Sequence, residues 1–159
     1  MIENVREAGD DDVNEIVRVI NLAYRVEDFF KRGDRTDARD VRRRMAEPES
    51  WFLVVDSPGG GLAGAVAVDI HDGRGHFGML SVDPAHQGKG IARLLIDAVE
   101  EKCKSKGCSQ VDIEVVNLRD DLPPFYTRLG FTEQGTTEFT PREELTREAH
   151  MVIWSKPIA

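Results

Sequence analysis

Residues Leu80–Leu95 read LSVDPAHQGKGIARLL, an apolar strand that continues through a glycine-containing turn directly into a helix. The first N–H groups of a helix lack partners within it and lie at the positive end of its dipole, so an anion satisfies them. Gly88 and Gly90 have no side chain, which lets the oxygens of a diphosphate approach the main chain, and Lys89 adds a positive charge. Apolar residues recur at helical spacing over Ile91–Val99, which buries one face and holds the helix N-terminus in place. The stretch therefore predicts a phosphate-binding helix N-terminus.

The spacing of this turn excludes two other kinds of phosphate loop. A dinucleotide-binding loop requires G-x-G-x-x-G, but Arg93 stands where the third glycine belongs. A Walker loop requires Ser or Thr after its lysine, and Lys89 is followed by Gly90. The pattern that matches is [Q/R]-x-x-G-x-[G/A], with Gln87, Gly90 and Ala92 at its defined positions. It resembles the coenzyme A pyrophosphate loop of the GNAT superfamily of N-acetyltransferases.

Composition limits the class of protein and its partners. The chain has 159 residues, 40% hydrophobic and 31% charged, and we expect one globular domain over residues 1–159. The formal net charge of −8 argues against a nucleic-acid partner, because such binding requires a basic surface. The charge could favour a cationic amine substrate, although a solvated acidic surface explains it more simply.

The expected location follows from similar reasoning. No apolar run approaches the roughly 18 residues of a membrane helix, and no signal sequence is recognisable, so we expect a cytoplasmic protein with no membrane partner. Cys103 and Cys108 lack C-x-x-C spacing and no histidine cluster occurs. This pattern predicts reduced structural thiols and no metal site.

Hydrophobic periodicity and turn residues divide the chain into elements. In the first half of the chain we expect a helix over 13–24, a loop over 24–36, a short helix to residue 45 capped by Thr36 or Asp37, and strands over 51–55, 62–70 and 76–82. In the second half we expect a helix over 90–106, a strand over 111–116, and a helix over 125–129 opened by Pro123 and Pro124. The last two strands are expected from Phe131 and over 149–154. A long helix joins strands 76–82 and 111–116, so these two should be parallel.

The resemblance covers nearly the whole chain. With an apolar start around Val5, the order β-α-α-β-β-β-α-β-α-β-β is also the GNAT order, and the run Phe125–Phe131 (FYTRLGF) resembles a second family motif. The fold class it implies is α/β (α+β), a mixed, mostly antiparallel sheet with a splayed central parallel strand pair and helices on both faces.

The resemblance also implies the residues that bind acetyl-CoA. In the family the pantetheine arm lies between the splayed strands, against the main chain of the strand before the loop, which needs such partners once it is unpaired. The implied coenzyme-binding residues are Leu80, Ser81, Val82, Gln87, Gly88, Lys89, Gly90, Ile91 and Ala92. Asn117 resembles an asparagine that contacts the coenzyme arm. Its alternative role is to end a strand and start a turn, because Leu118–Pro124 is an insertion relative to the family pattern.

Three residues are candidates for proton transfer. Tyr126 resembles the family's general acid, and a phenol with a pKa near ~10 suits a leaving thiolate whose conjugate acid lies near ~8.5. Its alternative role is to pack a short helix. His76 stands where some members carry a catalytic carboxylate, and Glu114 lies on the neighbouring strand. The family often has no single base, so His76 could also be a strand-end residue without a chemical role.

The acceptor pocket is expected in the segment without helical period. Aromatic and charged residues gather there, and the candidates are Tyr24, Glu27, Phe29, Phe30 and Arg32. Phe29 and Phe30 could instead belong to the core.

Together these features predict an N-acetyltransferase that moves an acetyl group from acetyl-CoA directly to a primary amine of a small molecule or peptide, leaving coenzyme A as product. Neither cysteine is one of the predicted site residues, so no covalent acyl-enzyme is expected. The alternatives are a non-catalytic acyl-CoA sensor and an interaction module that binds no nucleotide. The resemblance also allows a homodimer, because the last strands commonly pair across dimers in the family.

Overall fold

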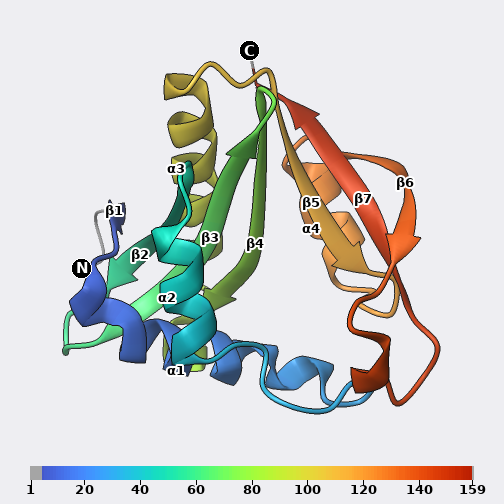
Figure 1. Ribbon diagram of the computed structural model, residues 1–159, viewed down its shortest axis with the longest axis horizontal. Helices are drawn as coiled ribbons and strands as arrows, with labels where there is room; N and C mark the ends of the chain where they lie inside the picture. The colour runs from blue at the N-terminus through green and yellow to red at the C-terminus, as the bar shows by residue number, and fades with distance from the viewer. Residues whose placement is uncertain (1–4, 159) are drawn as a thin grey trace.

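The computed structural model describes residues 5–158, so both ends of the predicted domain, 1–4 and 159, lie outside it. Its centre is a seven-stranded sheet in the order β1-β2-β3-β4-β5-β7-β6 (Figure 1). The strands are β1 (Val5–Glu7), β2 (Ser50–Asp56), β3 (Leu62–His71), β4 (Arg74–Val82), β5 (Gln110–Val116), β6 (Thr132–Glu138) and β7 (His150–Pro157). Every neighbouring pair is antiparallel except β4 and β5, which confirms the predicted mixed sheet.

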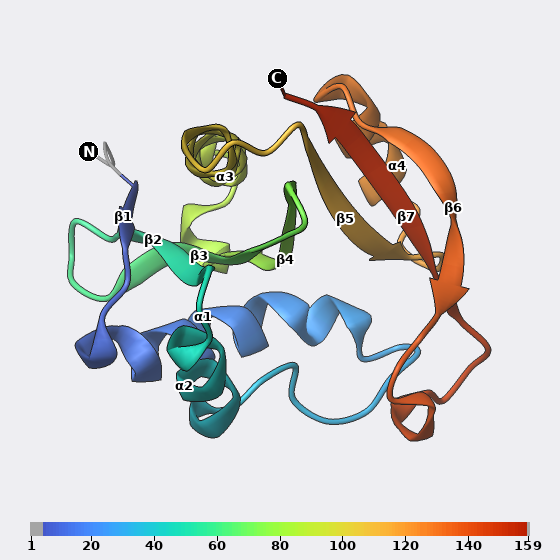
Figure 2. The same ribbon diagram turned by 45° about the horizontal axis from the view of Figure 1, so that its top comes forward.

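Helices cover both faces of the sheet, as Figure 2 shows. They are α1 (Val13–Ala23), α2 (Ala38–Ala46), α3 (Ile91–Ser105) and α4 (Leu122–Arg128), with short 3-10 turns η1 (Asp10–Asp12), η2 (Tyr24–Glu27), η3 (Pro84–His86) and η4 (Arg142–Glu144). The helix α1 packs its apolar face with α2 on one side of β2 to β4, and α3 and α4 pack on the other. Leu95 and Ile96 of α3 are fully buried, and burying side chains of this size contributes about 2 kcal/mol each. No helix within residues 5–158 has both the length and the apolar content needed to cross a bilayer.

The parallel pair is short because β4 and β5 diverge. Only Arg74 with Gln110, Gly75 with Val111 and His76 with Asp112 are in register. Beyond them β4 stays paired with β3, while β5 stays paired with β7 as far as Val116. This is the splayed pair that the resemblance implies.

A bulge in β4 gives a physical reason for the divergence. Ala65 pairs with Ser81 and Ala67 with Gly78, so Val66 faces two residues of β4. One of the two, Met79, has a φ of 53°, a backbone conformation that non-glycine residues rarely adopt. A bulge bends and twists its strand, which turns β4 away from β5. Because of the bulge, the side chain of Phe77 lies on the α3 side of the sheet and that of Met79 on the α1 side.

Two segments differ from the prediction by more than small shifts of an element's ends. The helix α4 begins at Leu122, so its two prolines lie inside the first turn rather than before the helix. The N–H groups of the first helical turn have no acceptor within the helix, so proline, which lacks an N–H, is tolerated there. The segment 24–36 is not all loop, because Tyr24–Glu27 forms η2. Lys31 then bridges to Leu145, which docks the segment against the connection between β6 and β7.

Candidate functional site

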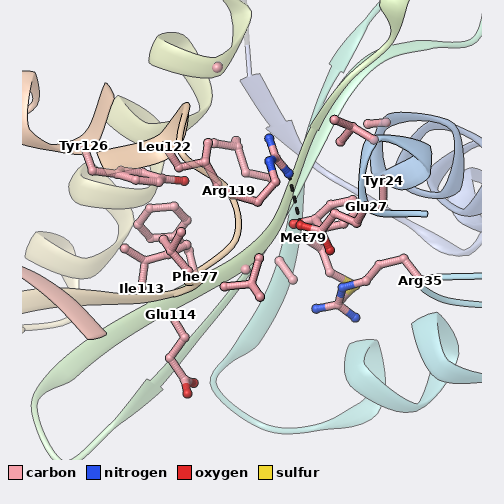
Figure 3. A pocket seen from close by; sticks show the side chains of 18 of the residues that line it. Tyr24, Glu27, Arg35, Phe77, Met79, Ile113, Glu114, Arg119, Leu122 and Tyr126 are labelled. Carbon is pink, nitrogen blue, oxygen red and sulfur yellow. Dashed lines mark hydrogen bonds and ion pairs between the residues drawn. The ribbon is translucent and has the colours of Figure 1, made fainter. Parts of the chain in front are cut away.

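A cleft of about 1080 Å³ opens where β4 and β5 diverge. Its walls come from β4, β5, η2, the turn before α3, the β5–α4 connection and the β6–β7 connection. Figure 3 shows side chains from both sides of the parted strands directed toward one another. Segments far apart in the sequence therefore share one hollow.

The predicted phosphate-binding turn lies at this cleft. Gln87, Gly88, Gly90, Ile91 and Ala92 line it, whereas Lys89 is exposed and lies outside the lining. The first helical bond of α3 runs from the Leu94 N–H to the Gly90 carbonyl. Within residues 5–158, none of the N–H groups of residues 88–93 donates a hydrogen bond to a protein acceptor. The turn therefore presents a group of free donors.

The two glycines of the turn have the conformation that an approaching anion requires. Gly88 and Gly90 both have a φ of 78°, and a Cβ on either would find no atom within 4 Å. The space over the main chain is open on the cleft side. A diphosphate fits this arrangement, because the donors, the helix dipole and the absence of side chains all favour a close anion.

The strand before the turn presents its edge to the cleft. Leu80 and Val82 line it, whereas the buried Ser81 donates its hydroxyl to the Met79 carbonyl. Beyond His76, no strand within the described residues pairs with this edge of β4. The unpaired main chain needs partners from solvent or from a bound molecule.

The hydroxyl of Tyr126 reaches the cleft from an aromatic cluster. The residue is 3% exposed, and its ring centroid lies 6.2 Å from that of Phe77 and 5.5 Å from that of Phe131. Figure 3 shows the hydroxyl directed toward the side where Arg119 lies. Burial, and then the neighbouring Tyr24, raise the pKa of Tyr126. At neutral pH this phenol keeps its proton and can only donate it.

His76 stands between two carboxylates where the parallel pair ends. Its Nδ1 lies 3.3 Å from Asp69 Oδ1, and its Nε2 lies 3.6 Å from Glu114 Oε2. Burial lowers the pKa of His76, but the hydrogen bond to Asp69 and the nearby carboxylate of Glu114 outweigh this and raise the pKa to about 9. The same contact with His76 lowers the pKa of Glu114. At neutral pH the imidazole is therefore protonated, which favours Glu114 over His76 as a proton acceptor.

A buried ion pair crosses from one wall of the cleft to the other. Arg119 Nη1 donates to Glu27 Oε2 at 3.0 Å, and the side chains are 14% and 9% exposed. Arg119 also donates to Asp121 at 3.0 and 2.9 Å. Burial raises the pKa of Glu27 above its ordinary value, although Arg119, Arg35 and Lys31 oppose that shift. Arg119 was not among the predicted site residues, and the only signal for it was the insertion Leu118–Pro124.

Only some of the predicted acceptor residues line the cleft. Tyr24 and Glu27 line the cleft. Phe30 is fully buried, 6.1 Å from the ring of Phe139, and Phe29 is 49% exposed outside the lining. Arg32 is exposed and also lies outside it.

Three further residues of this segment line the cleft, namely Val26, Lys31 and Arg35. The predicted acceptor residues did not include these members, because side-chain directions in an irregular segment follow no periodic pattern that the sequence could reveal.

The side chain of Asn117 is engaged at the end of β5. Its Oδ1 accepts a hydrogen bond from the His150 N–H at 2.8 Å, and the backbone N–H of Asn117 donates to the His150 carbonyl at 2.9 Å. Asn117 does not line the cleft. This geometry matches its alternative role as a strand-end turn residue, and a contact with the coenzyme arm stays a prediction.

Comparisons with known proteins point in one direction. The family model for the acetyltransferase (GNAT) domain matches residues 20–142. Mycothiol acetyltransferase of Propionibacterium freudenreichii is 31% identical over 151 residues, which is 89% of this chain and 47% of that protein. Human N-acetyltransferase 8B is 32% identical over 111 residues, which is 66% of this chain and 49% of that protein. The chain thus spans about half the length of the curated relatives it matches.

A solved structure supports the fold. The ribosomal-protein-S18-alanine N-acetyltransferase of Escherichia coli superposes with a TM-score of 0.79 at 14% identity, covering 100% of this chain and 95% of that one. At this identity the likeness concerns the arrangement of the chain and not its substrate.

Proposed function

The chain belongs to the acetyltransferase (GNAT) domain family, and on this premise we propose that it moves an acetyl group from acetyl-CoA directly to a primary amine. The observation that carries the proposal is the meeting of two features at one cleft. The free N–H donors of residues 88–93 lie at the start of α3, and the unpaired edge of β4 leads away from them. One extended molecule with a diphosphate at one end fits both.

The residues that would hold acetyl-CoA follow from this geometry. The N–H groups of residues 88–93 would bind its diphosphate, with Gly88 and Gly90 leaving room for the oxygens. The main chain of Leu80, Ser81 and Val82 would hold the pantetheine arm. Acetyl-CoA supplies an acetyl group that is activated as a thioester.

Two side chains would transfer protons during the reaction. An ammonium must lose a proton before its nitrogen can attack, and Glu114 is ionised at the cleft to accept it. Figure 3 shows the Glu114 carboxylate pointing away from Tyr126, so this transfer would pass through intervening water. Tyr126 keeps its proton at neutral pH and would donate it to the departing sulfur.

Direct transfer is favoured because neither cysteine can serve as a nucleophile at the cleft. Cys103 lies on α3 and Cys108 follows the helix, and both are buried in the core. Burial raises the pKa of the Cys103 thiol to about 12, which keeps it protonated.

Calorimetric titration with coenzyme A tests the binding half of the proposal. We expect Gly90→Val to weaken affinity about tenfold or more, because a side chain there strains the backbone and enters the space of the diphosphate. Gly73→Val is the matched control, since Gly73 also has a positive φ, 75°, and open space around it but lies in the turn between β3 and β4. Circular dichroism checks that both variants fold. Equal affinity in all three proteins would remove the assigned role of the turn.

Release of free thiol from acetyl-CoA over a panel of primary amines tests the catalytic half. Amine-dependent release supports the transferase. Tight coenzyme A binding without release on any amine would instead support the non-catalytic acyl-CoA sensor.

A further inference from the structure

Arg35 presents a cation to the cleft beside Glu27. Its guanidinium carbon lies 5.3 Å from the ring centroid of Tyr24, and Figure 3 shows all three side chains on one wall. Arg35 is half-buried and lines the cleft. Within the described part of the chain, no carboxylate forms an ion pair with it. Arg119, by contrast, is fully engaged by two carboxylates.

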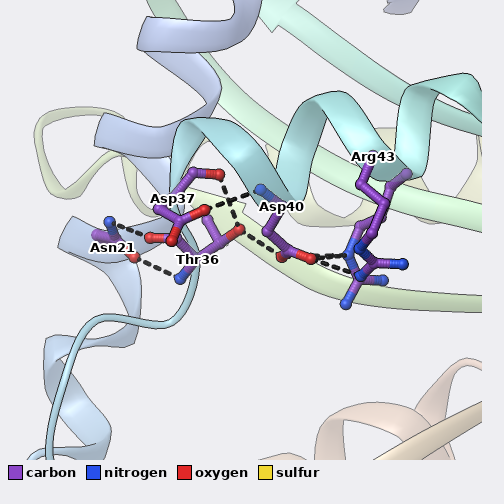
Figure 4. Close-up of polar contacts among 6 residues, drawn as sticks. Asn21, Thr36, Asp37, Asp40 and Arg43 are labelled. Carbon is purple, nitrogen blue, oxygen red and sulfur yellow. Dashed lines mark hydrogen bonds and ion pairs between the residues drawn. The ribbon is translucent and has the colours of Figure 1, made fainter.

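The backbone next to Arg35 is held rigidly. Thr36 is buried, and its N–H and carbonyl both bond to the side-chain amide of Asn21 on α1 at 2.9 Å (Figure 4). Its hydroxyl donates to Asp40 at 2.6 Å. Asp37 then caps α2 by accepting the Asp40 N–H at 2.8 Å. The backbone next to Arg35 is therefore held before any ligand arrives, so only the side chain must be ordered on binding, which lowers the entropic cost.

Glu27 supplies the opposite charge next to this cation. Arg119 occupies only its Oε2, and no hydrogen bond within residues 5–158 engages its Oε1. Arg35 is close enough to lower the pKa of Glu27, against the effect of burial. The wall thus offers a carboxylate oxygen and a guanidinium side by side.

We propose, resting on the acetyl transfer proposed above, that the acceptor is an amino acid, whose carboxylate pairs with Arg35 while its amino group faces Glu27. A guanidinium matches a carboxylate through two parallel hydrogen bonds, and the Tyr24 ring limits the orientations of its plane. A polyamine in the same position would place a cation against Arg35, which has no carboxylate partner among the described residues. A simple monoamine would leave Arg35 without an anion.

The test uses the twenty common L-amino acids, each with its carboxamide, as acceptors and as ligands of the coenzyme A-saturated protein. For the amino acids that react, we expect kcat/KM to be about tenfold or more above that of the matched carboxamide, the ratio that corresponds to one charge-assisted pair. In Arg35→Gln this preference should disappear because the KM for the amino acids rises. The kcat, and the kinetic constants measured with the carboxamides, should change little. Arg32→Gln is the control, because Arg32 lies in the same segment but outside the cleft.

Ligand-observed NMR gives a readout that does not need turnover. Amino acids should show strong saturation transfer with the wild-type protein and with Arg32→Gln, and with Arg35→Gln a signal reduced to that of the matched carboxamides. Equal use or equal binding of carboxamides would overturn the proposal, as would failure of every amino acid to bind or react. Thiol release with other amines shows independently whether acetyl transfer itself stands.

Discussion

Arg119 and Glu27, 92 positions apart, form a 3.0 Å charge-assisted hydrogen bond that ties the β5–α4 connection to η2 across the cleft. Both are largely buried, so loss of one partner leaves the other desolvated. We expect Arg119→Gln to lower the free energy of unfolding by about 2 kcal/mol, measured by urea denaturation.

Two further variants make this prediction specific. Arg142→Gln removes an exposed ion pair with Glu148 and should change stability by no more than about 0.5 kcal/mol. The double variant Glu27→Gln/Arg119→Gln should recover part of the loss, because no buried charge stays unpaired. Additive losses would show that the two side chains are not coupled.

Tyr126→Phe should separate chemistry from binding. The ring keeps its contacts with Phe77 and Phe131, so coenzyme A affinity should be unchanged while kcat falls about 100-fold. Calorimetry and thiol release measure the two quantities. Because burial raises the pKa of Tyr126, its ionisation should not limit the rate near neutral pH. Turnover at the wild-type rate would eliminate Tyr126 as the acid.

The pKa of His76 can be followed by NMR. The imidazole should titrate near pH 9, and Glu114→Gln should move the midpoint toward the ordinary 6.5, because one of its two carboxylate neighbours is gone. The raised pKa means that His76 stabilises the fold below about pH 6.5 and that this contribution is lost as the pH rises to about 9. The stability deficit of His76→Gln should therefore be larger at pH 6 than at pH 10. A midpoint near 6.5 in the wild-type protein would contradict the ion-pair geometry.

Asn117→Ala tests which of two roles this residue has. Removing the bond from the His150 N–H at the end of β5 should lower the free energy of unfolding by about 1 kcal/mol. Because Asn117 lies outside the cleft lining, coenzyme A affinity should stay at the wild-type value. A weaker affinity with unchanged stability would instead support the contact with the coenzyme arm.

From the sequence alone, periodicity and turn residues predicted the order of the elements, the parallel pair and the turn before α3, and the resemblance implied the family and the splayed mixed sheet. These features depend on short-range patterns. Period and turn residues assign each element, and a long helix between β4 and β5 requires them to be parallel. The glycines of the turn act on their own backbone, so Gly88 and Gly90 could be recognised without any distant partner.

Only the tertiary structure decided which side chains share the cleft. Phe30 and Arg35 come from the same irregular segment, yet one is buried in a core cluster and the other faces Tyr24 and Glu27. The partner of Glu27 is Arg119, which lies on a connection whose position depends on how β5 and α4 pack. Local pattern assigns a residue to an element, but charges and aromatic rings from distant segments meet only when the sheet and helices have packed.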